Sequence, residues 1–521
     1  MKRRDFLKFG TAGLAVVAVG TMADWPLVWR GPKAYAASLG GSRLKLDMVD
    51  ADAEMVDGIQ VPMWAYMLTD DEHGAALMAA RIPGPVLVAL EGDRIELHIT
   101  NHITTGGAHG FAIPGVPLTV DDATVDQVTI PFGGAEVRIE FTAPAAGTYM
   151  YLDPENAPVN RTMGLHGVLV VLPNPVGNNT PYSTPTSSIQ RLFNDLGTAA
   201  HFPGAPWDPA RNAIWVFNCI DPVKARAATL TGAAMAPATF LGGFLPQYFT
   251  INGKSGFFSA QHGHGDEDGA GGHANNLENT LLIGEGLFDP QGSVSIRGTV
   301  GQPIVIRNLN AGLMWQSPHI HGNHVYNLSD ANINGSRQIR SNLTMVDTWT
   351  MAPGDIHDVL HAFIAPPDIP ANFWEAANAG FNHELFPLLY PMHDHNEISN
   401  TAAGGNYPQG AVTHWQIDGL FDPTDPALGV ILIDRADLRV KTGQLLIEGR
   451  FSVPGVMLDI HAGVGNGLSI TRNVPVDANG RFRFRGRALK ALGSRFVTMM
   501  HHDPANPSAV HATRTIPLRL L

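Results

Sequence analysis

Short stretches of the chain alternate apolar and polar residues with a period of two, the spacing of a β-strand whose faces meet different surroundings. Residues 92–103 and 135–144 show this most clearly, because Ile, Leu, Val and Phe alternate there with charged or polar side chains. Residues 164–173 form an apolar run that ends at proline, as expected of a strand buried in a core. We therefore predict a β-sandwich domain over residues 42–173.

Two further β domains are expected downstream. Residues 174–212 are rich in Pro, Thr, Ser and Asn and predict a linker. An apolar segment at 214–220 begins a second domain, which we place at residues 213–420. Strand-like segments then predict a small third domain over residues 434–521. The 56 glycines and 38 prolines favour this all-β fold, with its many turns, over a helical one.

Residues 1–36 resemble a twin-arginine signal peptide. Arg3 and Arg4 precede a mildly apolar stretch at residues 12–19, which is too short to span a bilayer. Residues 34–36 read Ala-Tyr-Ala and offer a cleavage site. We expect export to the periplasm or the medium by the twin-arginine route, with an uncleaved anchor as the alternative.

The charge and the cysteine usage exclude several classes of partner and site. The net charge is −13, and residues 1–36 carry six Lys or Arg against two Asp or Glu, so the remaining chain is near −17. Such a surface disfavours nucleic acid and, once the signal is removed, membranes as partners. Cys219 is the only cysteine, which excludes an intramolecular disulfide and a CxxC metal site; we expect it to be a buried, inert thiol.

Four segments between about residues 80 and 420 resemble, in order and spacing, the copper-binding motifs of multicopper oxidases. In that family two HxH motifs lie in the first cupredoxin domain, and HxxHxH and HCHxxxH motifs lie in the last. Eight histidines hold a three-copper cluster that reduces dioxygen. Two more histidines, the cysteine and often a methionine hold the type 1 copper that accepts electrons. The resemblance implies two cupredoxin-like Greek-key β-sandwich domains, followed here by the small C-terminal β domain.

Every type 1 copper position is changed in this chain. By resemblance, Gln316 and Ser399 replace the two histidines, Asp394 replaces the cysteine and Gly404 lies near the methionine position. A blue-copper site needs a thiolate, so the usual electron relay is not expected. We expect Gln316, Asp394 and Ser399 to gather in a hydrogen-bonded cluster where the metal is missing.

Five of the eight cluster histidines remain: His109, His319, His321, His393 and His395. The last four form two pairs spaced two residues apart, so the members of each pair share one strand face. We predict that the five bind a metal. The resemblance favours copper, and imidazole ligands leave zinc or iron open. A metal-free hydrogen-bonded network is the alternative. Two-domain members of the family are usually trimers, which would place His109 opposite the other four across a subunit boundary.

Other polar residues allow two interpretations each. Asp153 and Glu155 stand where the second HxH motif is lost, and are either further ligands or loop carboxylates. Glu397 is either a proton donor beside the metal or a turn cap. A His-rich segment is either a weak metal binder or a solvated loop, and it contains His262, His264 and His273. Three histidines near the C-terminus follow no ligand spacing and are assigned no function: His501, His502 and His511.

Three functions follow from these observations. The leading one is an extracytoplasmic, copper-dependent oxidoreductase without a type 1 centre, in which a small-molecule substrate or dioxygen reaches the residual site directly. The second is a non-catalytic copper-binding protein for tolerance, storage or delivery. The third is a scaffold that keeps only the cupredoxin shape, against which the two retained histidine pairs argue.

Overall fold

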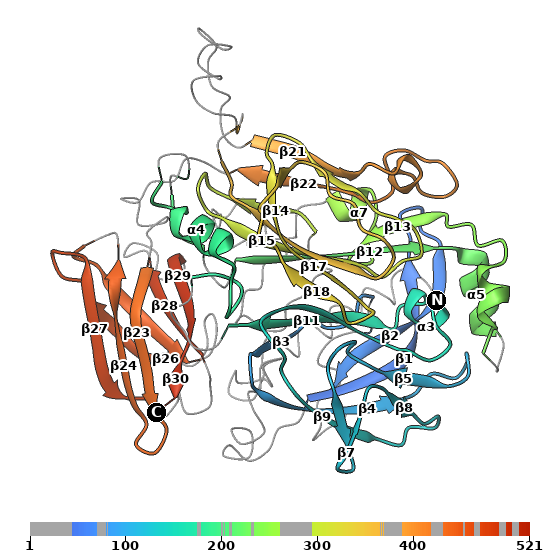
Figure 1. Ribbon diagram of the computed structural model, residues 1–521, viewed down its shortest axis with the longest axis horizontal. Coiled ribbons are helices and arrows are strands. Elements are labelled where there is room, and N and C mark those ends of the chain that lie inside the picture. The colour runs from blue at the N-terminus through green and yellow to red at the C-terminus, as the bar shows by residue number, and fades with distance from the viewer. Residues whose placement is uncertain are drawn as a thin grey trace, which may run out of the picture.

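The computed structural model of the protein describes residues 44–69, 82–173, 179–199, 211–230, 234–260, 294–364, 388–417 and, with short gaps, 431–520, besides residues 80, 202, 204–207, 366 and 368. Strands dominate these residues, which confirms the predicted all-β class. They form three β-sandwich units, two packed together and a third beside them (Figure 1).

The first unit contains one large and two small sheets. The large sheet has the strand order β2 (Gln60–Thr69), β1 (Leu44–Glu54), β4 (Arg94–Asn101), β9 (Val137–Thr142), β6 (Leu118–Val120) and β7 (Ala123–Val125). A three-stranded sheet contains β10 (Gly147–Leu152), β11 (His166–Leu172) and β3 (Leu87–Leu90), and a two-stranded sheet contains β5 (His109–Phe111) and β8 (Val128–Ile130). In β4 the predicted apolar positions Leu97 and Ile99 lie in the core, although the polar His98 and Thr100 between and after them are buried as well.

The second unit repeats this plan. Its larger sheet contains β13 (Tyr248–Ile251), β12 (Asn212–Ile220), β15 (Ile304–Asn310), β20 (Asp355–His361), β17 (Val325–Asn332) and β18 (Arg337–Ile339), with β19 (Met345–Val346) paired to β17. Its smaller sheet has the order β14 (Ile296–Gly298), β22 (Val412–Ile417), β21 (Leu388–Asp394) and β16 (Pro318–Ile320). A short 3₁₀ helix, η1 (Glu397–Asn400), follows β21. Cys219 lies in the core of this unit and is fully buried, and burial raises the pKa of its thiol, as expected of an inert cysteine.

The C-terminal unit consists of two four-stranded sheets. One contains β27 (Arg481–Arg487), β24 (Gln444–Phe451), β23 (Ile431–Arg439) and β30 (Arg519–Leu520). The other contains β26 (Ser469–Pro475), β25 (Met457–Ala462), β28 (Phe496–His502) and β29 (Val510–Pro517). The two sheets enclose an apolar core of their own.

The first two units share a continuous interface. Val168 and Val170 of β11 pack with Ile214 and Val216 of β12 in one apolar cluster. At the edge of this cluster Asp358 accepts hydrogen bonds from Thr148, Tyr182 and Ser329, and Arg307 lies 3.4 Å from it. Because all these groups are buried, the network ties the two units together in one geometry.

Helices cover the outside of the sandwiches. The predicted linker contains α4 (Ser187–Asp195), which begins at the capping hydroxyl of Thr186 and buries Leu192 and Phe193 in a cluster with Leu360 of β20. Two further helices, α5 (Pro222–Leu230) and α6 (Pro237–Leu241), follow β12, and both contribute buried residues to the core of the first unit. Helix α5 packs on β2, and Figure 1 shows it at the edge of the molecule. The short α3 (Val159–Thr162) and α7 (Phe257–Ala260) complete the described helices. None of the helices in the described ranges is long and apolar enough to cross a membrane.

Candidate metal centre

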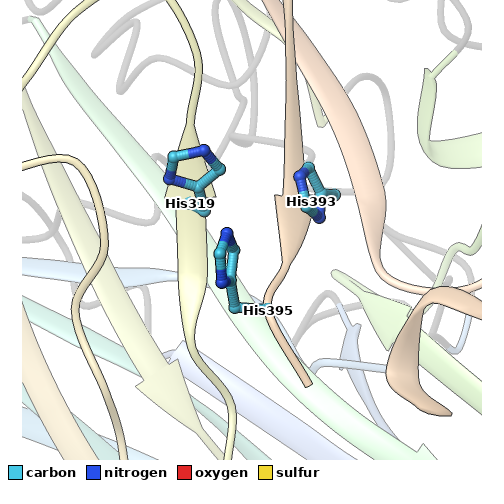
Figure 2. Close-up of side chains that lie close together, drawn as sticks. All are labelled: His319, His393 and His395. Carbon is cyan, nitrogen blue, oxygen red and sulfur yellow. The ribbon is translucent and has the colours of Figure 1, made fainter. Parts of the chain in front are cut away.

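Two adjacent strands bring four histidines together. β16 and β21 are antiparallel neighbours, and their register places His319 directly opposite His393. His321 follows β16, two residues after His319, and His395 follows β21, two residues after His393. Figure 2 shows the rings of His319, His393 and His395 gathered between the two strands. The two histidines of each pair therefore lie on one face of the sheet, as predicted.

The four rings form a compact group. The ring centroid of His319 lies 4.6 Å from that of His321, 5.3 Å from that of His393 and 4.5 Å from that of His395. One ring nitrogen from each of His319, His393 and His395 lies within 4.8 Å of the corresponding nitrogens of the other two. The Nε2 atoms of His321 and His393 are 3.2 Å apart. The lone pairs of several imidazoles can therefore meet at one point.

Hydrogen bonds fix the orientation of two of these rings. Nδ1 of His319 lies 3.1 Å from the backbone oxygen of Asp347 and 2.9 Å from the hydroxyl of Thr348. Nδ1 of His393 lies 3.1 Å from the backbone oxygen of Asp394. A carbonyl oxygen can only accept, so each Nδ1 carries the proton and each Nε2 keeps its lone pair. Metal-binding histidines are oriented in this way by a second hydrogen bond.

The arrangement fits a single metal ion. Metal–imidazole bonds measure about 2.0–2.1 Å, so two ligand nitrogens on one tetrahedral ion lie roughly 3.3–3.4 Å apart. The separation of 3.2 Å between His321 Nε2 and His393 Nε2 is close to that value. A hydrogen bond between two neutral imidazoles has the same length. The distance therefore supports a metal site only in combination with the Nδ1 contacts of His319 and His393.

The electrostatics of the site favour neutral ligands. Burial lowers the pKa of His319, although the hydrogen bond to Asp347 opposes this effect. Burial and then the charges of His393 and His395 lower the pKa of His321. Because a metal competes with protons for imidazole, lowered pKa values keep these rings available for binding at neutral pH. His321 and His395 are exposed to solvent, so a small molecule can reach the site.

His109 is not brought into this group. It begins β5, has no exposed surface, and places Nδ1 2.8 Å from Oδ2 of Asp153. Its Nε2 lies 3.4 Å from the backbone oxygen of Thr105, inside the same chain. Among the described residues no ring contact joins it to the other four histidines. Its place as a fifth ligand therefore stays a prediction.

Asp153 is the centre of a buried cluster around His109. It accepts hydrogen bonds from the backbone nitrogens of Gly110 and Glu155 and from the side chain of Asn160. Burial raises the pKa of its carboxyl, and the contact with His109 opposes the rise. Asp153 and Glu155 are the two carboxylates considered as further ligands. Asp153 contacts His109, whereas Glu155 accepts a hydrogen bond from Thr129.

Residues 234–236, which precede α6, lie against this end of the first unit. Ala234 stands so close to Gly107 that a Cβ on the glycine would lie 2.9 Å from it. Asn156 donates a hydrogen bond to the backbone oxygen of Met235 at 2.9 Å. The covering segment belongs to the same chain, so the surroundings of His109 are closed without a neighbouring subunit. Sequence patterns gave no sign of this packing.

The position that the resemblance assigns to the type 1 copper holds polar residues, and Asp394 is linked there to backbone nitrogens and to the side chain of Ser399. Asp394 is fully buried and accepts hydrogen bonds from the backbone nitrogens of Ser317 and Asn396. Burial raises the pKa of Asp394, and these two hydrogen bonds oppose the rise. Ser399 donates to the backbone oxygen of Asn396. The buried amide of Gln316 makes no side-chain hydrogen bond within the described part of the protein.

The remaining candidates lie apart from the four histidines or outside the described residues. Glu397 begins η1, which favours its reading as a residue of a turn. His501 and His502 lie in β28 of the C-terminal unit. The segment with His262, His264 and His273 lies outside the described residues. One partner that sequence reasoning missed is Thr348, which orients His319 from 29 residues away and belongs to no motif.

Comparisons with known proteins point to the same class. Residues 63–175 match the family model described as multicopper oxidase. The copper-containing nitrite reductase of Pseudomonas chlororaphis is 35% identical over 109 residues, which is 20% of this chain and 29% of that protein. Over these residues the chain resembles multicopper oxidases, and this resemblance supports the cupredoxin superfamily. The L-ascorbate oxidase of Cucumis sativus is 33% identical over 104 residues, 19% of this chain and 17% of the oxidase.

These likenesses are partial. The chain spans less than a third of the length of either of these two relatives. A solved structure, the blue copper oxidase from Nitrosomonas europaea, is 19% identical with a TM-score of 0.44, covering 72% of this chain and 85% of that one. Residues 1–29 match the model described as ubiquitinol-cytochrome C reductase Fe-S subunit TAT signal, which supports export.

Proposed function

We propose that this multicopper-oxidase-like protein is exported to the periplasm or the medium and binds copper through His319, His321, His393 and His395. The bound copper would supply one-electron redox chemistry to a small-molecule substrate or to dioxygen. The observation that carries the proposal is the convergence of four imidazoles, two of which have their Nδ1 atoms occupied by backbone oxygens. The copper enzymes among the relatives support this metal over zinc or iron.

The protein residues have distinct parts in this proposal. His319 and His393 would hold the ion in a fixed orientation, because their rings are tied to Asp347 and Asp394. The exposed rings of His321 and His395 would border the approach of the substrate. Because the proposal includes no type 1 copper, the reductant would have to contact this group directly. Asp347 is half-exposed beside His319 at 3.7 Å and is suited to attract a cationic or hydrogen-bonding substrate.

The oligomeric state belongs to the proposal as well. We infer a homotrimer from the resemblance to two-domain multicopper oxidases, with His109 near the four histidines of a neighbouring subunit. Because His109 is buried within its own chain, its ring would have to become exposed before it could approach the histidines of a neighbouring subunit. Sedimentation of a monomer that retains one tightly bound metal ion would remove both the trimer and the fifth ligand.

A second function rests on a specific observation. The group of four imidazoles is complete within one unit and lies partly exposed, which also suits a protein that binds and transfers copper without turnover. Such a protein would release copper to a competing chelator and consume no oxygen. The oxidase would consume oxygen in proportion to an added phenolic or other soluble reductant.

The deciding experiment combines metal analysis with oxygen uptake. Protein exported through its own signal is analysed by plasma mass spectrometry and then tested in an oxygen electrode with a panel of reductants. We expect about one tightly bound copper per chain and oxygen uptake that His393→Ala abolishes. His324→Ala is the matched control, because His324 pairs with Asp368 rather than with the four histidines. Stoichiometric copper without uptake would favour the binding protein, and absence of bound metal would refute both.

A further inference from the structure

The C-terminal unit differs from the rest of the chain in the sign of its charge. Residues 431–521 contain thirteen Lys or Arg and six Asp or Glu, a net charge of +7, whereas the chain as a whole carries −13. The other 430 residues therefore carry −20. A basic module on an acidic protein is not explained by the metal site, and it suggests an anionic partner.

The positive charge is gathered on one face of one sheet. In the register of β23, β24 and β27, Arg435 lies opposite Glu448, which lies opposite Arg483. Directly opposed residues share a face, and the intervening side chains, such as Ile447 and Phe482, are buried in the core. The outward face therefore carries seven arginines and two acids, namely Arg435, Arg439, Arg450, Arg481, Arg483, Arg485 and Arg487, with Asp437 and Glu448.

The two acids neutralise only part of this face, which we call the arginine face. Arg435 pairs with Asp437 at 2.6 Å, and Arg483 pairs with Glu448 at 3.0 Å. Within the described residues, Arg439, Arg481 and Arg485 form no ion pair. All seven arginines are exposed. Seven arginines against two acids leave this face with a positive surplus.

Four of these arginines form a straight row. Arg481, Arg483, Arg485 and Arg487 occupy alternate positions of β27, which is the edge strand of its sheet. Alternate residues on a strand are separated by about 6.7 Å, so the row is roughly 20 Å long. Each guanidinium offers a planar pair of donors that matches a carboxylate or sulfate group. In Figure 1 β27 lies at the far end of the long axis, away from the first two units.

We propose that the arginine face binds a linear anionic polysaccharide, and that the C-terminal unit anchors the exported protein to such a polymer. A slender chain can lie along the row while it stays more than a screening length, about 8 Å, from the acidic units. A flat anionic membrane fits less well, because it would also meet the acidic surface. Among the described residues of this unit, Val440 and Met457 are the large apolar side chains that are exposed, and neither belongs to the arginine face.

The test compares the full-length mature protein with two triple variants of equal charge. One is Arg481→Gln, Arg485→Gln and Arg487→Gln, which empties most of the row. The control is Arg191→Gln, Arg226→Gln and Arg472→Gln, three exposed arginines outside the arginine face. Binding to a heparin hexasaccharide and to a polygalacturonate oligosaccharide is measured by calorimetry at 0.15 M salt, with neutral dextran as the blank. Thermal melting of both variants checks that the fold is retained.

We expect at least one of the two anionic oligosaccharides to bind the wild type and the control alike. The row variant should bind at least about tenfold more weakly, since each lost contact is a charge-assisted hydrogen bond. Equal weakening in both variants would overturn the proposal, because only net charge would then matter. Absence of binding to either oligosaccharide, or binding to phosphatidylglycerol vesicles alone, would overturn it too. Metal content serves as an independent check that the histidine site is unaffected.

Discussion

His321 and His393 stand 72 residues apart in the chain, yet their Nε2 atoms lie 3.2 Å from each other. This contact exists because β16 and β21 are paired and their histidines are placed on one face of the sheet. Since Nδ1 of His393 is held by a backbone oxygen, its Nε2 can accept a metal or a proton. Substitution of either histidine of this pair can therefore distinguish a bound metal from a metal-free hydrogen-bonded network.

Removing one imidazole should separate these two states. In His393→Ala the affinity for copper is expected to fall by at least about tenfold, since one of four ligands is lost. A metal in excess over its dissociation constant by a factor of 1,000 stabilises the folded state by about 4 kcal/mol. Chelation should therefore lower the melting temperature of the wild type and of His324→Ala by more than that of His393→Ala. No response to chelation in any of the three proteins would identify a metal-free network.

The absence of a thiolate ligand predicts the colour of the copper-loaded protein. Cys219 is fully buried in the core of the second unit, and Asp394 stands at the position that the resemblance assigns to the copper-binding cysteine. An intense blue band needs a copper–thiolate bond. We expect only weak visible absorption after loading with copper(II), identical in the wild type and in Cys219→Ala. A strong band near that of blue copper proteins would show that the type 1 site has been misassigned.

The sequence predicted some levels of this structure better than others. Strand alternation such as that of Leu97 and Ile99 located the sheets, because burial of one face imposes a period of two. The spacing of His319 and His321 likewise predicted a shared face. The covering of His109 depends on a tertiary contact between Gly107 and Ala234, which are far apart in the chain and follow no local pattern. Local sequence patterns do not predict a contact of this kind.

Replacement of His109 tests both its structural role and its place as a fifth ligand. His109→Ala leaves the buried carboxylate of Asp153 without its imidazole partner. Removing one partner of a buried hydrogen bond leaves the other partner unsatisfied, which lowers the free energy of unfolding by about 1–3 kcal/mol. Urea unfolding measures this loss. We expect the folded variant to retain its copper, and loss of copper from folded His109→Gln as well would instead support the fifth ligand.

The polar network between the first two units should contribute strongly to stability. Asp358 accepts hydrogen bonds from Thr148 and Tyr182 and lies 3.4 Å from Arg307, all of them buried. Asp358→Ala is expected to cost about 3–5 kcal/mol, because it leaves the buried guanidinium of Arg307 uncompensated. The double variant Asp358→Leu with Arg307→Met removes both charges and should cost less than Asp358→Ala alone. Denaturant unfolding of the three proteins compares these costs, and a larger loss in the double variant would contradict the argument.

Stability should also fall in mild acid because of a buried neutral histidine. Burial lowers the pKa of His166 to about 4, and its Nδ1 lies 2.8 Å from the backbone oxygen of Arg161. The unfolded state binds the proton near pH 6.5 and the folded state only near pH 4, so the unfolded state is favoured progressively as the pH falls between these values. The loss approaches about 1.4 kcal/mol per pH unit for one such group. Metal-free His166→Gln should show a shallower decline in melting temperature from pH 6.5 to 4 than the metal-free wild type. Parallel declines would mean that His166 is already protonated, or uncovered, in the folded protein.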